Sequence, residues 1–360
     1  DSDASGDLTV QLEDTISVTG QVHSKHLDLT PFMDAPQTTA STSADEEAEI
    51  EGNSADEAPT DEFVFTDEPL PFDLLSAGFA DFQVTIDEFV QGPLHLEALT
   101  GAAKLEQGTL DLESGFVVAA GGNAALEVSL SSRESNADLD VNLDITDLRL
   151  SLSENNERPV ADIPLIGLSA DIESNGNSMR ALAANANGKV LLTQGAGKVD
   201  NSAMGFFSAD IVAQLFGALN PFAKDEPYSA WECTIFALDI VDGVAEIEPM
   251  LAQSEKLTIV GEGKIDFNTE ALDISFNTKP RRGVGVSADM FLTPFIQLGG
   301  SMAAPRITLD KSGVLLSGGA AFLTGGISFF VQGAADRASG TADRCAAALA
   351  LAKGQDVATE

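Results

Sequence analysis

The sequence predicts a mainly β protein: an extended, twisted antiparallel sheet that curls into a groove, with a few short helices that pack on it or cap it. Apolar residues recur at every second position along many short runs, and turn residues separate these runs. Of the 360 residues, 44% are hydrophobic, which is enough for a sizeable buried surface. This alternation gives each strand one apolar and one solvated face.

The first strands are predicted over residues 7–29. Leu8, Val10 and Leu12 alternate with polar residues, and Ile16 and Val18 resume the pattern. We expect this stretch to be the end of a preceding strand module, over residues 1–33.

An acidic segment follows at residues 34–68. It contains twelve Asp and Glu residues and no Lys, Arg or His. Such a segment cannot bury enough apolar surface to offset the entropy of ordering. We therefore expect a disordered insert.

The clearest strand pattern lies between Phe82 and Leu152. From Leu139 to Ile145, aliphatic residues alternate with Asp and Asn, so one face is aliphatic and the other is acidic. The apolar positions change from odd to even numbers after Asp147. A change of one residue would move side chains to the other face, which predicts a bulge or turn at this point.

A further meander is predicted between Trp231 and Pro305. Ile265 and Phe267 alternate, and so do Leu272, Ile274 and Phe276. Turn pairs such as Asp242-Gly243 and Asn268-Thr269 separate the runs. Short runs joined by such turns are typical of antiparallel strands.

Helices are predicted at three places. A short turn of helix follows Pro69, and a second helix begins after the Ser178 cap and stops before Gly188. The longest covers residues 202–219, where a broad apolar stripe predicts a helix lying on the apolar sheet face.

Residues 312–335 carry no charge and are long enough to span a membrane. Repeated glycines weaken an isolated helix there. We expect an apolar hairpin that caps the sheet, within a capping segment and C-terminal helix over residues 312–360.

The charge balance limits the possible partners. The chain has 19 Lys and Arg against 57 Asp and Glu, a net charge of -38. This charge would repel nucleic-acid phosphates, so no nucleic-acid partner is expected. The chain also has 20 Phe but one Trp and one Tyr. Phe suits surfaces that offer no hydrogen bond, either a dry core or a lining for acyl chains.

No catalytic or metal-binding pattern is found in the sequence. Of the three histidines, His23 and His26 are three positions apart in a strand-like region, which places them on opposite faces. No cofactor is expected.

Cys233 and Cys345 are the only cysteines, and from composition alone they suit either one disulfide or two buried thiols. The chain opens in strand pattern without a signal peptide, so we expect a fragment or a processed piece.

Several phrases, in order and with their spacing, resemble the AsmA family of bacterial envelope proteins, especially its carboxy-terminal region. They are KHLDLTPFM, EPLPFDLLSAGFADFQVTI, GNSMRALAANANGKVLL, ALNPF with the downstream Cys233, GGSMAAPRITLD and DRCAAALALAKG. The resemblance implies a non-catalytic periplasmic protein, anchored in the inner membrane through a segment absent from this chain. It implies phospholipid and the envelope membranes as partners, and a role in lipid transport and outer-membrane assembly.

The resemblance also implies specific roles for individual residues. An oxidising periplasm would join Cys233 to Cys345. An AsmA-like β-groove domain would cover residues 69–311. Its apolar lining would include Leu139, Val141, Leu143, Ile145, Ile265, Phe267, Leu272, Ile274 and Phe276. The alternative is a structural or scaffolding β-protein of the envelope, whose apolar face is sealed by its own helices and carries no lipid.

Overall fold

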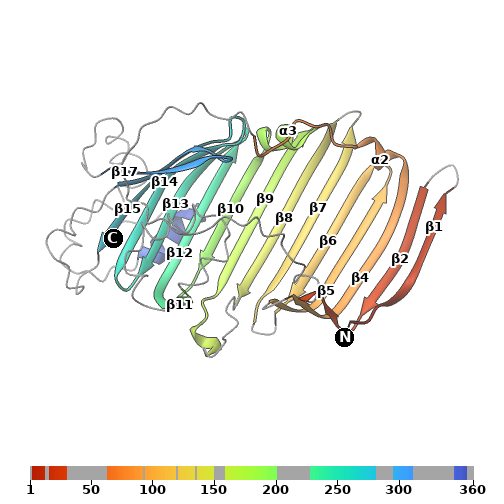
Figure 1. Cartoon of the computed structure of the whole chain (residues 1–360), viewed down its shortest axis with the longest axis horizontal. Coiled ribbons are helices and arrows are strands. Elements are labelled where there is room, and N and C mark those ends of the chain that lie inside the picture. The colour runs from red at the N-terminus through yellow and green to blue at the C-terminus, as the bar shows by residue number, and fades with distance from the viewer. Residues whose placement is uncertain are drawn as a thin grey trace, which may run out of the picture.

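The strands form one 17-stranded sheet that extends along the length of the molecule (Figure 1). The computed structural model describes residues 2–12, 16–30, 63–91, 94–118, 121–133, 136–149, 159–200, 228–280, 295–310 and 344–354. A mainly β protein with one large, mostly antiparallel sheet and few short helices is thereby confirmed. Curling of the sheet into a groove stays a prediction.

The strands are distributed over the whole described chain. They are β1 (Ser5–Leu12), β2 (Ile16–Ser24), β3 (Leu27–Asp28), β4 (Gly78–Gln91), β5 (Leu94–Glu106), β6 (Thr109–Val117), β7 (Asn123–Arg133), β8 (Asn136–Leu148), β9 (Ile166–Gly176), β10 (Asn187–Gln194), β11 (Gly197–Asp200), β12 (Tyr228–Val241), β13 (Val244–Ser254), β14 (Leu257–Asp266), β15 (Ala271–Pro280), β16 (Phe295–Ser301) and β17 (Pro305–Asp310).

Strands that are close in the sequence pair with one another from β1 to β17. Most pairs are antiparallel, as short turns require. Among the described pairs, only β2 and β3 run parallel to β4. The long connection between β3 and β4 permits this parallel pairing, because it returns the chain to the same end of the sheet. The strands at residues 5–28 thus continue the same sheet as β4.

The helices are short and lie at the edges of the sheet or on it. They are α2 (Asp73–Ser76), the 3-10 turn η1 (Val160–Asp162), α3 (Met179–Ala184) and α7 (Arg344–Ala352). The Ser178 side chain accepts a hydrogen bond from the Ala181 N–H, at 3.1 Å, as its predicted role as a helix cap requires. The predicted short helix after Pro69 is α2.

The irregularity predicted near Asp147 is a bulge in β8. The register shifts between Ile145, which pairs with Leu168, and Leu148, which pairs with Ile166. Asp147 has a positive φ of 51°. Because Leu168 and Ile166 are two residues apart on β9, Leu148 stays on the same face as Ile145. The bulge therefore preserves the apolar face despite the change of phase in the sequence.

Two predicted elements, the helix at 202–219 and the hairpin at 312–335, lie outside the described residues. Most of the predicted acidic insert also lies outside them. Its last residues, 63–68, are described and have defined contacts: the Val64 and Phe65 N–H groups donate to the Glu270 carboxylate. The sequence boundary at 68 is therefore too late, because backbone hydrogen bonds and two Phe rings hold this end of the segment to the sheet.

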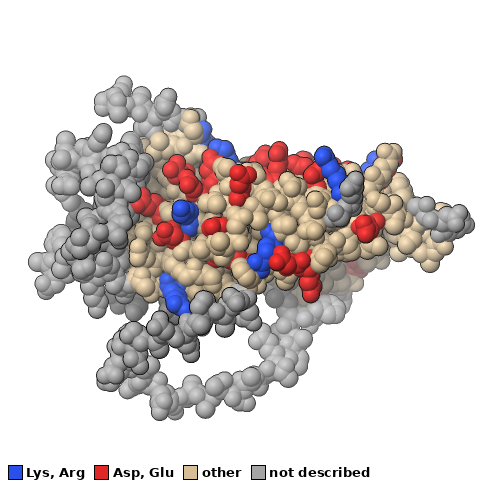
Figure 2. Space-filling view, turned by 90° about the horizontal axis from the view of Figure 1, so that it is seen from above, with Lys and Arg blue, Asp and Glu red and all other residues tan. Residues whose placement is uncertain are grey.

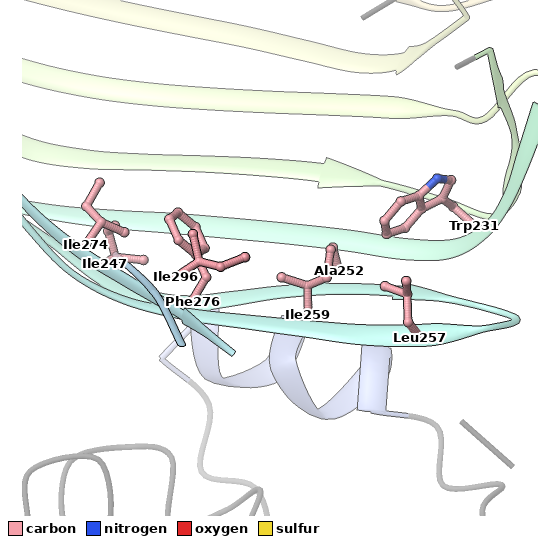
Figure 3. Packing of buried hydrophobic residues seen from close by; sticks show 8 residues of the cluster. All are labelled: Trp231, Ile247, Ala252, Leu257, Ile259, Ile274, Phe276 and Ile296. Carbon is pink, nitrogen blue, oxygen red and sulfur yellow. The ribbon is translucent and has the colours of Figure 1, made fainter. Parts of the chain in front are cut away.

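The best-buried core lies at the C-terminal end of the sheet. Eight buried side chains from β12 to β16 pack together there: Trp231, Ile247, Ala252, Leu257, Ile259, Ile274, Phe276 and Ile296. Figure 3 shows them on one side of the strands, with the α7 ribbon on the other side. Packed side chains of the strands themselves thus close one side of this end of the sheet, and α7 covers the other side.

Candidate functional site

One face of the sheet is uncharged along a row of register partners from β2 to β17. We call this side the apolar face. The row is Val22, Val84, Gly101, Ser114, Leu126, Leu143, Ala170, Val190, Leu238, Ile247, Gly263, Ile274, Leu298 and Ile307. Directly paired residues point to the same side of a sheet, so these side chains share one surface.

The neighbouring row, one residue along each strand, has the opposite character. We call its side the outer face. The row is Gln83, Ala102, Glu113, Glu127, Asn142, Asp171, Lys189, Asp239, Glu246, Lys264, Asp273, Gly299 and Arg306. Charged or amide side chains fill most of it. A one-residue step thus separates a hydrocarbon surface from an ionic one across most of the sheet.

The structure places the predicted lining residues on the apolar face. Leu143 and Ile274 belong to the uncharged row, and the other predicted residues of β8 and β15 lie two or four residues from them along the same strands. Ile265 pairs with Leu272 on the same side. Phe267 follows β14 and packs against the same buried cluster as Ile265. The β8 group and the β14–β15 group share this surface, but β9, β10, β12 and β13 lie between them.

These two groups differ in burial. Leu139, Val141, Leu143 and Ile145 are only half-buried. In the β15 group, Ile274 is 7% exposed and Phe276 is 4% exposed. The apolar face is therefore accessible over the central strands and closed over the C-terminal strands.

A segment that we call the strap, residues 63–77, lies along one edge of this face. Figure 1 shows it crossing the ends of the central strands between α3 and the start of β4. Leu70 N–H donates to Asn177 O at 2.8 Å, and Pro69 bridges to Ser178. Beneath it, Phe72 is buried in a cluster with Ala137 and Leu182, and Leu139 packs against this cluster. The strap thus closes one end of the β7 to β9 part of the apolar face.

Glu270, in the β14–β15 turn, holds the start of the strap. It is 1% exposed. Its two carboxylate oxygens accept hydrogen bonds from Val64 N–H at 2.6 Å and from Phe65 N–H at 2.8 Å. The Phe65 ring meets the Phe267 ring edge-on, with centroids 6.3 Å apart. The two N–H donors replace the water that the buried carboxylate has lost, and the same two hydrogen bonds give the strap N–H groups their acceptors.

Arg180, on α3, holds the same segment from the other side. Its guanidinium carbon lies 3.5 Å from the centroid of the Phe63 ring, a cation–π contact. Its Nη2 donates to Phe65 O at 3.1 Å, and its Nε lies 3.3 Å from Asp67 Oδ1. The sequence gives no signal for Arg180 or Glu270, because their partners are far away along the chain.

The C-terminal helix α7 covers the outer face rather than the apolar face. Ala348 is buried against Cys233, Ile235, Leu251 and Val260, which alternate with the residues of the apolar face. A disulfide joins Cys233 to Cys345, with Cα atoms 6.0 Å apart. The predicted pairing of these cysteines is thus present, and it attaches the helix to β12.

The central part of the outer face is acidic. A shallow hollow of about 650 Å³ spans β4 to β9, and the carboxylates of Asp81, Glu113, Asp140 and Asp171 line it together with Lys104. The hydrogen bond and charge of Glu106 raise the pKa of Lys104. Figure 2 looks from above onto the ends of the strands, where acidic side chains also lie along the edge of the sheet. The acidic hollow favours water or cations rather than hydrocarbon.

Comparison with known proteins decides the family. The AsmA family matches residues 4–250, which is more than half of the chain. The chain belongs to the AsmA family. No curated protein and no solved structure matches it. The matched part of this AsmA protein includes both the strap and the accessible part of the apolar face, while β14 to β17 and α7 lie beyond it.

The described part of this AsmA protein offers no group of three or more His, Cys, Asp or Glu residues that could hold a metal ion. His23 and His26 instead pair with different partners: His23 Nδ1 lies 3.0 Å from Thr85 Oγ1, and His26 Nδ1 lies 2.9 Å from Glu88 Oε2. None of the described helices has the length and hydropathy needed to cross a membrane.

Proposed function

We propose that this AsmA protein binds phospholipid acyl chains on the apolar face and supports lipid transport and outer-membrane assembly in the bacterial envelope. The single observation that carries the proposal is the uncharged row through Leu143 beside the charged row through Asn142. A protein that covers its own core rarely leaves an uncharged surface accessible across so many strands, and a large accessible apolar surface is typical of a binding site.

The groove follows from the same proposal. Acyl chains would lie on the half-buried central strands, and curling of the sheet would shield them from water. The strap supports this arrangement, since it already closes one end of the apolar face at Phe72 and Leu139. The disulfide supports a periplasmic location, because such bonds persist in oxidising compartments.

A structural or scaffolding role is the alternative, and one observation favours it for the C-terminal strands. Phe276 and Ile296 are buried in a closed cluster there, at 4% and 1% exposure. If the whole apolar face were covered in this way, it would have no room for lipid.

The two functions differ in the effect of one carboxylate on the central face. Val141→Asp would place a charge against bound acyl chains, at a cost of several kcal/mol unless water enters. On an open face water can enter, so we expect a folded protein that has lost its lipid. Asn142→Asp is the matched control, because it adds the same carboxylate one residue away on the outer face.

Mass spectrometry of lipid extracted from each purified variant, combined with circular dichroism melting, measures both effects. The proposal requires lipid in the parent and in Asn142→Asp, and a folded Val141→Asp without it. A parent that contains no lipid, together with an unfolded Val141→Asp, would establish the scaffolding alternative.

A further inference from the structure

Hydrogen-bonding atoms without partners lie on the apolar face at the edge opposite the strap. Among the described residues, Ser24 Oγ, Gln194 Nε2 and Thr278 Oγ1 are buried and have no hydrogen-bond partner. Ser24 is 2% exposed and Thr278 is 8% exposed. β2 ends at Ser24 and β10 at Gln194, while Thr278 is two residues before the end of β15. All three strands begin at the strap edge.

Gln194 has the most informative surroundings of the three. It pairs with Ile166 of β9 on one side and with Thr234 of β12 on the other. Ile166 packs against the buried Leu148, and Trp231, at the next apolar-face position along β12, belongs to the C-terminal core. The amide of Gln194 and the hydroxyl of Thr234 therefore interrupt the apolar face between two buried hydrophobic clusters.

The same row of register partners leads on to Thr278. It runs from Thr234 through Ala252 and Ile259 to Thr278. Hydrogen-bonding side chains therefore recur along this edge, whereas the row through Leu143 and Ile274 contains only one, Ser114. The polar positions are thus confined to one end of the strands.

Buried polar atoms in native proteins nearly always have a partner, so a buried donor without one calls for an explanation, of which a bound molecule is one. A single water needs two to four polar neighbours, and the register neighbours of Gln194 supply only the Thr234 hydroxyl. A ligand that fits must bring its own acceptor oxygen and also cover the hydrocarbon on both sides. An acyl lipid has both features.

We propose that Gln194 and Thr234 form a subsite for an ester carbonyl of a diacyl lipid. This inference rests on the proposed function. Gln194 Nε2 and the Thr234 hydroxyl supply donors, which suit an ester, because an ester has only acceptors. The acyl chains then lie toward the strap, and the headgroup lies at the opposite edge. Ser24 and Thr278 offer equivalent donors elsewhere along that edge.

The test compares two phosphatidylethanolamines with equal chains and the same headgroup. One is a diacyl lipid and the other a dialkyl ether lipid, which lacks the carbonyls. Each lipid competes with a fluorescent phospholipid for the delipidated full chain. We expect the parent to bind the diacyl lipid about tenfold more tightly, the effect of one good hydrogen bond. Gln194→Met should remove this preference by weakening only diacyl binding.

Gln83→Met is the matched control, because Gln83 is an exposed amide on the outer face. It should leave the preference unchanged. Thr234→Val should reduce the preference and provides a second test if Gln194→Met folds poorly. Circular dichroism should show Gln194→Met at least as stable as the parent, since the change removes an unpaired buried amide.

Equal binding of the two lipids by the parent would overturn the ester subsite and leave the proposed function intact. If Gln194→Met weakened the binding of both lipids equally, the Gln194 amide would be donating to the headgroup phosphate that the two lipids share. That result would overturn the ester assignment. Binding of neither lipid by the parent would refute the proposed function itself.

Discussion

Glu270 shows how a single side chain at a turn can organise a distant segment. Its carboxylate is buried, yet both oxygens accept backbone hydrogens from the strap, from residues about two hundred positions earlier in the chain. A buried charge is tolerated when such hydrogen bonds replace the lost water. The strap therefore depends on a residue that no local pattern distinguishes.

Replacing this carboxylate should loosen the strap. We expect Glu270→Ala to lower the free energy of unfolding by about 2 kcal/mol, through loss of two hydrogen bonds to a charged group. Glu270→Gln keeps one acceptor oxygen and should lose less. Urea unfolding measures both. Asp273→Ala, which removes an exposed carboxylate of β15, should have almost no effect, and an equal loss in that control would contradict this account.

Glu262, on the outer side of β14, gives a pH-dependent prediction. Burial raises its pKa above the ordinary value of 4.5. The folded protein therefore holds this proton more tightly than the unfolded chain, and stability falls as the pH rises from about 4.5 through the raised pKa. Glu262→Gln should melt at a higher temperature than the parent at pH 7 and lose this advantage near pH 4. If the difference in melting temperature between Glu262→Gln and the parent were the same at both pH values, ionisation of the Glu262 carboxyl could not be its cause.

At the scale of elements, the strap divides the connection between β3 and β4 into two functional parts. Residues 63–77 contact the sheet, whereas the acidic residues 34–62 remain a predicted disordered insert. Replacing 34–62 with a short Gly-Ser linker should leave the melting temperature nearly unchanged, because loop-closure entropy varies slowly with length.

Extending the same replacement to residue 68 should lower the melting temperature by several degrees. This longer deletion removes the Phe63, Phe65 and Asp67 contacts to Arg180, Glu270 and Phe267. Differential scanning calorimetry of the two variants gives the comparison. Equal melting temperatures would show that the strap contacts contribute nothing to stability.

The disulfide and α7 form a second element with a measurable role. The bond joins residues 112 positions apart, and closing a loop of this size stabilises by roughly 2 to 4 kcal/mol. The double variant Cys233→Ser, Cys345→Ser should be less stable by this amount and should expose Leu251 and Val260 of the outer face. Denaturant unfolding and dye binding report the two effects. Reducing agent should affect the parent alone, and sensitivity of the double variant would point to another cause.

At the scale of the whole molecule, the charge is the dominant feature. The whole chain carries a net charge of -38, and on the outer face acidic side chains line a broad hollow, where they repel one another. Raising NaCl from about 0.01 M to about 0.5 M shortens the Debye length several-fold and should raise the melting temperature. A melting temperature that falls with salt would mean that attractive ion pairs outweigh this repulsion.

Much of the sheet could be predicted from local pattern. Alternation around Val141 identified the apolar face of β8, and the change of phase at Asp147 identified the bulge. The Asp242-Gly243 pair identified the turn between β12 and β13, where both residues have positive φ. These features depend on neighbours within a few residues, so the sequence displays them directly.

The sequence by itself determined the strand pattern, the two chemical faces, the acidity and the resemblance to the AsmA family. Only the tertiary structure decided which strands carry an accessible apolar face, where the strap attaches, and which buried polar atoms lack a partner. The alternation of apolar and polar residues indicates which side of a strand a residue occupies. Burial depends on what covers that side, and at Glu270 the cover is the strap, which lies about two hundred positions earlier in the chain.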